Sequence, residues 1–158
     1  MRAQQQSRAA ASSAWPLQTQ LADREVALVR QTYRAIAGTG DSLAEHFYDK
    51  LFELDPSLRE LFPADMAAQR EKLMLALEHT VGYLDSVDSW VDQVRELGRR
   101  HRVYGARELD YATVGDALLM TLERALGSHW TADVERAWEK TFTLLSQVMV
   151  QSSPGGEP

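Results

Sequence analysis

Apolar residues recur along most of the chain at intervals of three and four positions, and no segment alternates between apolar and polar residues. This spacing gathers apolar side chains on one face of an α-helix, so the pattern predicts helices and no strands. The first two apolar faces comprise Val26, Val29, Tyr33 and Ile36, and Leu43, Phe47, Tyr48, Leu51 and Phe52. The sequence Gly-Thr-Gly-Asp at 38–41 separates these two predicted helices.

A short third helix and four longer ones are predicted after these two. Asp55 can cap the short helix, Pro56 suits its first turn, and Pro63 disfavours its continuation. The longer helices have apolar faces that comprise Met66, Leu73, Leu77, Val81 and Leu84; Trp90, Val94, Leu97 and His101; Tyr111, Val114, Leu118, Leu122 and Ala125; and Trp138, Phe142, Leu145 and Met149. Gly105 can end the second of the four, and Leu-Gly-Ser-His-Trp-Thr at 126–131 turns the chain before the last.

The predicted fold is therefore all-α, with six to eight helices in one domain that spans residues 21–151. No internal repeat and no second domain is evident. Residues 1–20 are rich in Gln, Ala and Ser and include Arg2 and Arg8, yet the alanine-serine stretch is too short and too weakly apolar for an export signal. We expect a flexible extension there and a second flexible tail at 152–158, where Pro, Gly and Ser predominate.

Composition narrows the possible chemistry. The 158 residues include 44% hydrophobic residues, which suffice for a real core, and the net charge of -6 disfavours binding to nucleic acid or to an anionic membrane. The absence of cysteine excludes disulfides, thiolate metal sites, cysteine nucleophiles and iron–sulfur clusters. No apolar run approaches the roughly 20 residues needed to span a bilayer, and we expect a cytoplasmic protein.

Four histidines are present, and His101 is the one that stands clearly at the end of an apolar face. His46, His79 and His129 are most simply explained as surface or near-surface residues. A buried imidazole is ordinarily a core residue bonded to a carbonyl, and no HExxH motif or paired His/carboxylate spacing supports a zinc or di-iron site. One nitrogen ligand does suffice, however, for an iron that a macrocycle already holds by four nitrogens.

Five segments together carry a family resemblance. They are HFYDKLFELDPSLRELF, MAAQREKLM, LGRRHRVYG, YATVGDALLMTLERALG and AWEKTFTLLSQVM, in this order along the chain. The chain resembles a globin, and among globins it is most similar to single-domain bacterial globins and to the haem domain of flavohaemoglobins. The resemblance covers roughly residues 21–151 and implies a globin fold, three helices on three around a haem pocket.

The resemblance also implies roles for individual residues. His101 matches the proximal histidine that binds the iron of haem b (iron protoporphyrin IX), with no CxxCH motif for covalent attachment. Tyr48 and Gln69 match two polar residues on the opposite, distal side, where they would stabilise a bound ligand. The positions that would contact the macrocycle or its propionates, or line the proximal side, are Phe62, Lys72, Leu73, Leu77, Leu97, Arg100, Tyr104, Tyr111 and Val114.

The residues themselves leave alternatives open at these positions. Gln69 lies one turn before Leu73, on the inward side of its helix, and a structural role explains it as simply as a ligand does. Tyr48 shares the inward side with Leu51 and Phe52, where a tyrosine is more often a core residue. Two polar groups that converge on one apolar pocket are less common, and specific small-ligand sites are built in this way. The arginines around His101 suit a helix C-terminus.

The implied function is reversible binding of O2 with high affinity, together with other diatomic ligands such as NO and CO. Family members with this Tyr/Gln pair are also associated with nitric oxide dioxygenation, which here would need a separate reductase because flavohaemoglobins carry a reductase module that this sequence lacks. A haem-based gas sensor is a third possibility. The acidic residue of the flavohaemoglobin proximal network has no clear match, since Glu157 lies in the Pro/Gly-rich tail.

Overall fold

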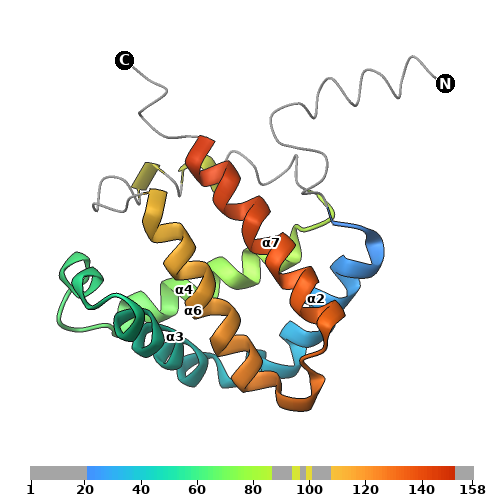
Figure 1. Ribbon diagram of the computed structural model, residues 1–158, viewed down its shortest axis with the longest axis horizontal. Coiled ribbons are helices and arrows are strands. Elements are labelled where there is room, and N and C mark those ends of the chain that lie inside the picture. The colour runs from blue at the N-terminus through green and yellow to red at the C-terminus, as the bar shows by residue number, and fades with distance from the viewer. Residues whose placement is uncertain (1–20, 87–93, 97–98, 101–107, 152–158) are drawn as a thin grey trace.

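Figure 1 shows the computed structural model of the chain, which describes residues 21–86, 94–96, 99–100 and 108–151. Helices account for the regular structure of these residues, and no strand occurs among them, so the predicted all-α class is confirmed. The α-helices are α2 (Asp23–Ile36), α3 (Gly40–Leu54), α4 (Ala67–Gly82), α6 (Glu108–Leu126) and α7 (Ala132–Gln151). Short 3-10 helices are η2 (Ala37–Thr39), η3 (Pro56–Leu61) and η4 (Gly127–His129).

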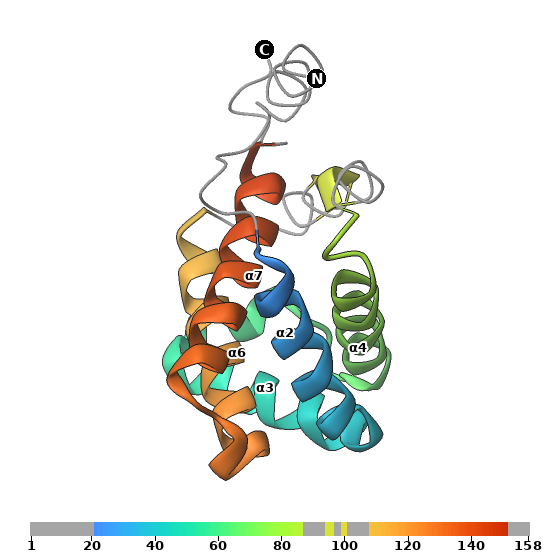
Figure 2. The ribbon, with the colours of Figure 1, turned by 90° about the vertical axis from the view of Figure 1, so that its right-hand side faces the viewer.

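The helices cross one another around a single core. Helix α2 packs against both α4 and α7, and Figure 2 shows α4 on one side of α2 and α7 on the other. Helix α3 packs against α4 and α6, while α6 and α7 lie next to each other. This arrangement brings the middle of α3 against the first half of α4, where the predicted distal residues lie.

The apolar faces predicted from the spacing form this core. Val29, Leu51, Leu122 and Trp138 are each at most 1% exposed. The indole nitrogen of Trp138 donates a hydrogen bond of 3.0 Å to the hydroxyl of Thr32, so the polar atom of this large side chain is satisfied inside the core. Helices α2 and α7 are therefore joined by a buried polar contact as well as by apolar packing.

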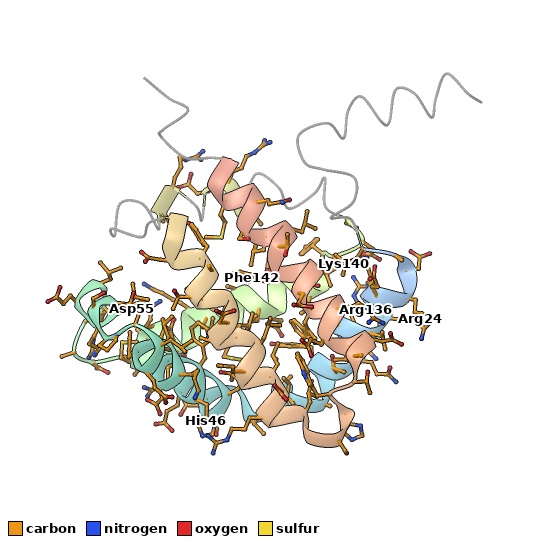
Figure 3. All side chains as sticks on the ribbon, in the orientation of Figure 1. Arg24, His46, Asp55, Arg136, Lys140 and Phe142 are labelled. Atoms are coloured by element: carbon orange, nitrogen blue, oxygen red, sulfur yellow. The ribbon has the colours of Figure 1, made fainter. Side chains whose placement is uncertain are left out.

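Ion pairs at the surface add to the contact between α2 and α7. Arg24 pairs with Asp133 at 3.1 Å, and Lys140 pairs with Glu25 at 2.8 Å; Figure 3 shows Arg24 and Lys140 in the region where the two helices meet. Partial burial opposes ionisation of Glu25, but its hydrogen bonds to Lys140 and to the backbone of Ala22 outweigh this effect and lower its pKa. Exposed pairs of this kind contribute little each.

The structure confirms the predicted third helix and changes the extent of two predicted apolar faces. The third helix is confirmed as η3, where Asp55 accepts a hydrogen bond of 3.1 Å from the backbone of Ser57. The prediction that Ala125 lies on the apolar face of α6 is wrong, because Ala125 is exposed and Leu126, four residues after Leu122, is buried in its place. Leu84 lies beyond the end of α4 yet is buried, so the apolar face continues into the turn.

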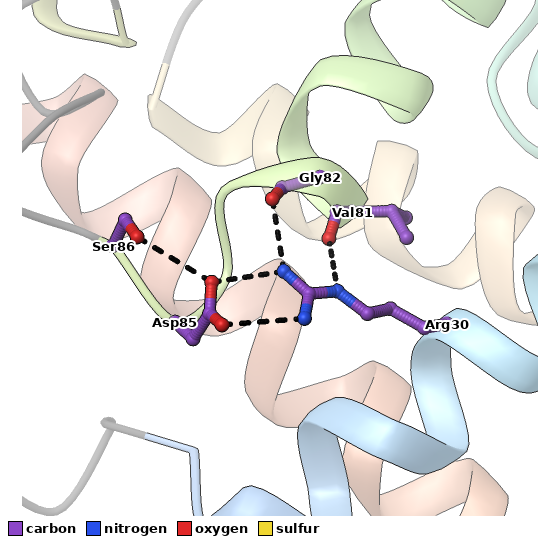
Figure 4. Close-up of polar contacts among 5 residues, drawn as sticks. All are labelled: Arg30, Val81, Gly82, Asp85 and Ser86. Carbon is purple, nitrogen blue, oxygen red and sulfur yellow. Dashed lines mark hydrogen bonds and ion pairs between the residues drawn. The ribbon is translucent and has the colours of Figure 1, made fainter.

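The C-terminal end of α4 is held by an arginine from α2. Figure 4 shows the Arg30 guanidinium between the carbonyl oxygens of Val81 and Gly82, at 3.1 and 2.9 Å, and the carboxylate of Asp85. Two further hydrogen bonds, of 2.9 and 3.3 Å, join the guanidinium to the two oxygens of Asp85. Because the last carbonyls of a helix have no partner within it, Arg30 acts as a C-cap supplied by another helix.

Helix α6 packs tightly against α7 at Gly115. A Cβ atom at this position would lie 2.6 Å from the Phe142 ring of α7, which is closer than real Cβ contacts. Phe142 is labelled in Figure 3, between these two helices. Glycine at 115 therefore makes room for the aromatic ring.

Candidate functional site

Two polar side chains meet where α3 and α4 pack together. The side-chain amide of Gln69, in the first turn of α4, donates a hydrogen bond of 3.1 Å to the phenol oxygen of Tyr48 in α3. Tyr48 is only 6% exposed, and Gln69 is half-buried. The two positions that the family resemblance assigned to the distal side are thus in direct contact, although they lie 21 residues apart in sequence.

Aromatic rings surround the phenol of Tyr48. Its ring centroid lies 4.9 Å from that of Phe47, 5.5 Å from that of Phe62 and 6.0 Å from that of Phe52. Phe52 and Phe62 also contact each other edge to face, at 5.5 Å. Separations and tilts of this kind are favourable for aromatic pairs, so the phenol is fixed in an apolar environment. We call Phe47, Tyr48, Phe52 and Phe62 the aromatic cluster.

The environment of Tyr48 decides its protonation state. Burial raises the pKa of the phenol above its ordinary value of 10.0, and the hydrogen bond from Gln69 opposes this only in part. The phenol therefore keeps its proton at neutral pH. Because its oxygen accepts from the Gln69 amide, its own hydrogen remains available for a further acceptor. The site can thus donate hydrogen bonds to a small polar ligand from neutral groups.

The other predicted site residues differ in burial, and Phe62 is the one with a described contact to Tyr48. Phe62, Leu73 and Val114 are half-buried side chains packed against the core, whereas Leu77 is a buried core residue. Tyr111 is half-buried on α6, and Lys72 is exposed on α4. Arg100 is exposed as well, and its guanidinium lies 3.7 Å from the carboxylate of Glu96. The remaining predicted residues, Leu97, His101 and Tyr104, lie outside the described part of the chain.

The histidines within the described ranges make no cluster with carboxylates. His46 is half-buried on α3, and His79 is exposed on α4, where its ring lies 4.7 Å from that of Tyr83. Among the residues that the structure describes, no group of three or more histidine, aspartate or glutamate side chains could hold a metal ion. Nor is any helix among them long and apolar enough to cross a membrane.

The sequence pattern did not identify Arg59 as part of this region. Its guanidinium donates hydrogen bonds to the carbonyl oxygens of Phe62, Pro63 and Ala64, at 3.2, 2.9 and 3.2 Å, and lies 5.4 Å from the ring centroid of Phe52. The available signal was a cation near the end of a short helix that precedes a proline. That signal predicts a helix cap but not which backbone groups the cation contacts.

The chain is similar in sequence and in fold to known proteins. The family model described as Globin matches residues 45–149. Neuroglobin from Chaenocephalus aceratus is 28% identical over 145 residues, which cover 83% of this chain and 91% of that protein. Neuroglobin from Tetraodon nigroviridis is 31% identical over 131 residues, which cover 70% of this chain and 82% of that protein. A flavohemoprotein from Bacillus subtilis is 25% identical, and its match covers 82% of this chain but 33% of the flavohemoprotein.

Solved structures share the fold. A bacterial globin from Campylobacter jejuni superposes with a TM-score of 0.74 at 17% identity, over 83% of this chain and 95% of that one. A hexacoordinated heme protein from an anhydrobiotic tardigrade also has a TM-score of 0.74, at 19% identity, over 87% of this chain and 98% of that one. The family model covers well over half of the chain, and its match includes the contact between Tyr48 and Gln69. The chain belongs to the globin family.

Proposed function

We propose that this globin holds one haem b through His101 and binds O2 with high affinity on the side that Tyr48 and Gln69 face. The observation that carries the proposal is the hydrogen bond between these two residues inside the aromatic cluster. A buried phenol with an available hydrogen is suited to a small polar ligand. Membership of the globin family supports a bound haem as the group to which this ligand attaches.

The side chains around the pair fit a flat apolar group. Phe62, Leu73 and Val114 are apolar but only half-buried, which suits contact with a further apolar surface. The polar groups beside them are an amide and a protonated phenol, neither of which competes strongly for a metal. Bound haem supplies an iron atom at which diatomic gases bind, and His101 is the residue proposed to hold it.

The protein's own contribution is to retain the ligand. Tyr48 directs its phenolic hydrogen toward the ligand, while one amide hydrogen of Gln69 fixes the phenol and the other remains for the ligand. Each neutral hydrogen bond is worth on the order of 1 kcal/mol, so the pair slows the escape of a polar ligand such as O2. The aromatic cluster makes the surroundings of the phenol apolar, which strengthens these hydrogen bonds.

Haem content tests the attachment. We expect the purified protein reconstituted with haem to show one Soret band and about one haem per chain. Replacing His101 with Ala should abolish the proximal bond and change both the haem content and the Soret spectrum. Unchanged iron coordination in the His101→Ala variant would contradict the assignment. Glu71→Ala serves as a control, because it alters an exposed side chain on α4 that is not among the predicted site residues.

The sixth coordination position of the iron is proposed to hold no histidine. Gln69 is a poor ligand for iron, and His79 is exposed, with its ring beside that of Tyr83. We therefore expect a five-coordinate or weakly six-coordinate ferrous state, in contrast to the hexacoordinated heme protein from the tardigrade. A bis-histidine spectrum that disappears in His79→Ala or His46→Ala would contradict this expectation.

A second candidate function is nitric oxide dioxygenation with electrons from a separate reductase. Similarity to the Bacillus subtilis flavohemoprotein favours it, as does a protonated phenol that can polarise bound O2. The test mixes the oxygenated protein with nitric oxide in a stopped-flow instrument and then repeats the reaction with and without a ferredoxin-type reductase. Fast single turnover with sustained turnover only when reductase is present would support this function; slow oxidation would favour plain O2 binding or sensing.

A further inference from the structure

In the loop between η3 and α4, several backbone carbonyl groups accept hydrogen bonds from one side chain. Arg59 donates to three successive carbonyl oxygens, those of Phe62, Pro63 and Ala64, at distances of 2.9–3.2 Å. The backbone of Phe62 is extended, with φ of -123° and ψ of 153°, and Pro63 has no N–H to donate. Helical hydrogen bonds therefore do not continue through this loop, and Arg59 satisfies the carbonyl groups that they leave.

The same guanidinium also reaches the aromatic cluster. Its central carbon lies 5.4 Å from the ring centroid of Phe52, within the range of a cation–π contact. Phe52 contacts Phe62 at 5.5 Å and Tyr48 at 6.0 Å. Arg59 thus touches both the backbone that carries Phe62 and the ring that lies beside Phe62 and Tyr48.

A planar guanidinium is well suited to this position. It presents five N–H donors in a fixed fork, so one side chain can bind several carbonyl oxygens while its face lies over a ring. A lysine ammonium could donate to one or two of the carbonyls but could not reproduce the fork. The contacts therefore depend on arginine specifically and not only on positive charge.

We propose that Arg59 is a positioning residue for the distal site: it fixes the loop 62–64 and Phe52, and so holds Phe62 and the Tyr48 phenol in the orientation that retains a ligand. The inference rests on the proposed function, because it assigns Phe62 and Tyr48 to the ligand side of a haem. It goes beyond that function in naming a residue that acts through Phe62 and Tyr48 on how firmly the ligand is held.

The first experiment measures the loop itself in the haem-loaded full chain. Amide hydrogen–deuterium exchange over residues 61–67 is compared between the parent, Arg59→Met, Arg59→Lys and Arg124→Met. Arg124 is an exposed arginine on α6 and controls for loss of a charge. We expect exchange about tenfold faster in Arg59→Met, which corresponds to about 1.4 kcal/mol, an intermediate effect in Arg59→Lys, and no change in Arg124→Met. Parental exchange in Arg59→Met would overturn the proposal.

The second experiment asks whether the loop affects the distal site. Carbon monoxide is the probe, and its infrared stretching band reports the hydrogen bonds that the surrounding side chains donate to it. We expect the band of Arg59→Met to broaden and shift in the same direction as those of Phe62→Leu and Tyr48→Phe. If Arg59→Met does not fold, Arg59→Lys gives the same comparison with a smaller shift.

The outcomes separate this proposal from the one on which it rests. A parental carbon monoxide band in Arg59→Met or Arg59→Lys, with shifted bands in Phe62→Leu and Tyr48→Phe, would leave the proposed function standing and overturn the role of Arg59. A parental band in all of these variants would contradict the assignment of the distal site. Loss of haem from His101→Ala but not from Arg59→Met would support the proposed attachment and show that a shifted band in Arg59→Met does not come from loss of haem.

Discussion

The two ends of α4 are held in different ways. Near its start, Gln69 donates one neutral hydrogen bond to the buried phenol of Tyr48. At its end, the charged guanidinium of Arg30 binds two carbonyl groups and the carboxylate of Asp85, whose side chain is about half exposed. The contact of Gln69 is one neutral hydrogen bond beside aromatic rings, whereas the contact of Arg30 is ionic and reaches the surface.

The two contacts differ in whether they leave a hydrogen-bond donor available for another group. The guanidinium of Arg30 donates to backbone and carboxylate oxygens that need partners, so this contact completes a helix end. The bond from Gln69 uses the phenol oxygen of Tyr48 and leaves the phenolic hydrogen for another acceptor. A buried donor that is held in place and keeps its hydrogen is what the proposed ligand site requires, whereas the contacts of Arg30 contribute to stability. The two ends of α4 should therefore respond differently to substitution.

Replacing Arg30 with Met should give the largest effect on stability. The variant loses hydrogen bonds from a charged donor to the last carbonyls of α4, which we estimate at about 2 kcal/mol of the free energy of unfolding. Denaturant unfolding measures this loss, and O2 release from the haem-loaded variant should stay at the parental rate. If the variant is as stable as the parent, the contacts of the Arg30 guanidinium do not contribute to the free energy of unfolding.

Replacing Tyr48 with Phe should have the opposite profile. The ring and its packing remain, but the hydrogen that stabilises the ligand is lost, so O2 release should accelerate by up to about tenfold for 1.4 kcal/mol. Stopped-flow displacement of O2 measures the rate. The free energy of unfolding should change by less than in Arg30→Met, and parental O2 release would place the ligand elsewhere.

Replacing Gln69 with Leu should speed O2 release less than Tyr48→Phe does, by a factor of about five, because the amide hydrogen proposed for the ligand and the anchor of the phenol are lost while the phenolic hydrogen remains. The double variant should release O2 more slowly than the product of the two single effects requires, since both residues act on one ligand. The same displacement measurement on all four proteins gives the coupling. Independent effects would mean that the hydrogen bond between the two residues has no bearing on retention.

The smallest predicted effect is a pH dependence at the surface end of α4. Hydrogen bonds from Arg30 lower the pKa of the Asp85 carboxyl below its ordinary value of 3.8. Because the folded pKa is depressed, the pair stabilises the protein above about pH 3.8, and this contribution is lost as the pH falls through the folded pKa. The stability difference between the parent and Asp85→Asn should therefore shrink in acid, as measured by denaturant unfolding at a series of pH values.

Periodicity predicted the helices because burial on one face requires it, and it located Tyr48 and Gln69 on inward faces. Their contact depends on how α3 and α4 cross, which spacing does not specify; the family resemblance supplied that pairing. Arg30 and Arg59 were missed because their partners are mainly backbone carbonyls, which carry no sequence signal. For Arg30 these partners lie 51 and 52 residues away. The proximal assignment of His101 remains a prediction, since that residue lies outside the described ranges.

The close approach at Gly115 has a consequence for how this sequence can change. A side chain at 115 would meet the Phe142 ring at 2.6 Å, so Gly115→Ala alone requires the ring or one of the two packed helices to shift. Replacing Phe142 with a smaller residue first would open the space that alanine needs. The order of substitution therefore matters: a descendant of this sequence acquires both changes more readily when Phe142→Leu comes first than when Gly115→Ala does. Related sequences should show these two positions changing together, with the larger residue on one helix matched by a smaller one on the other.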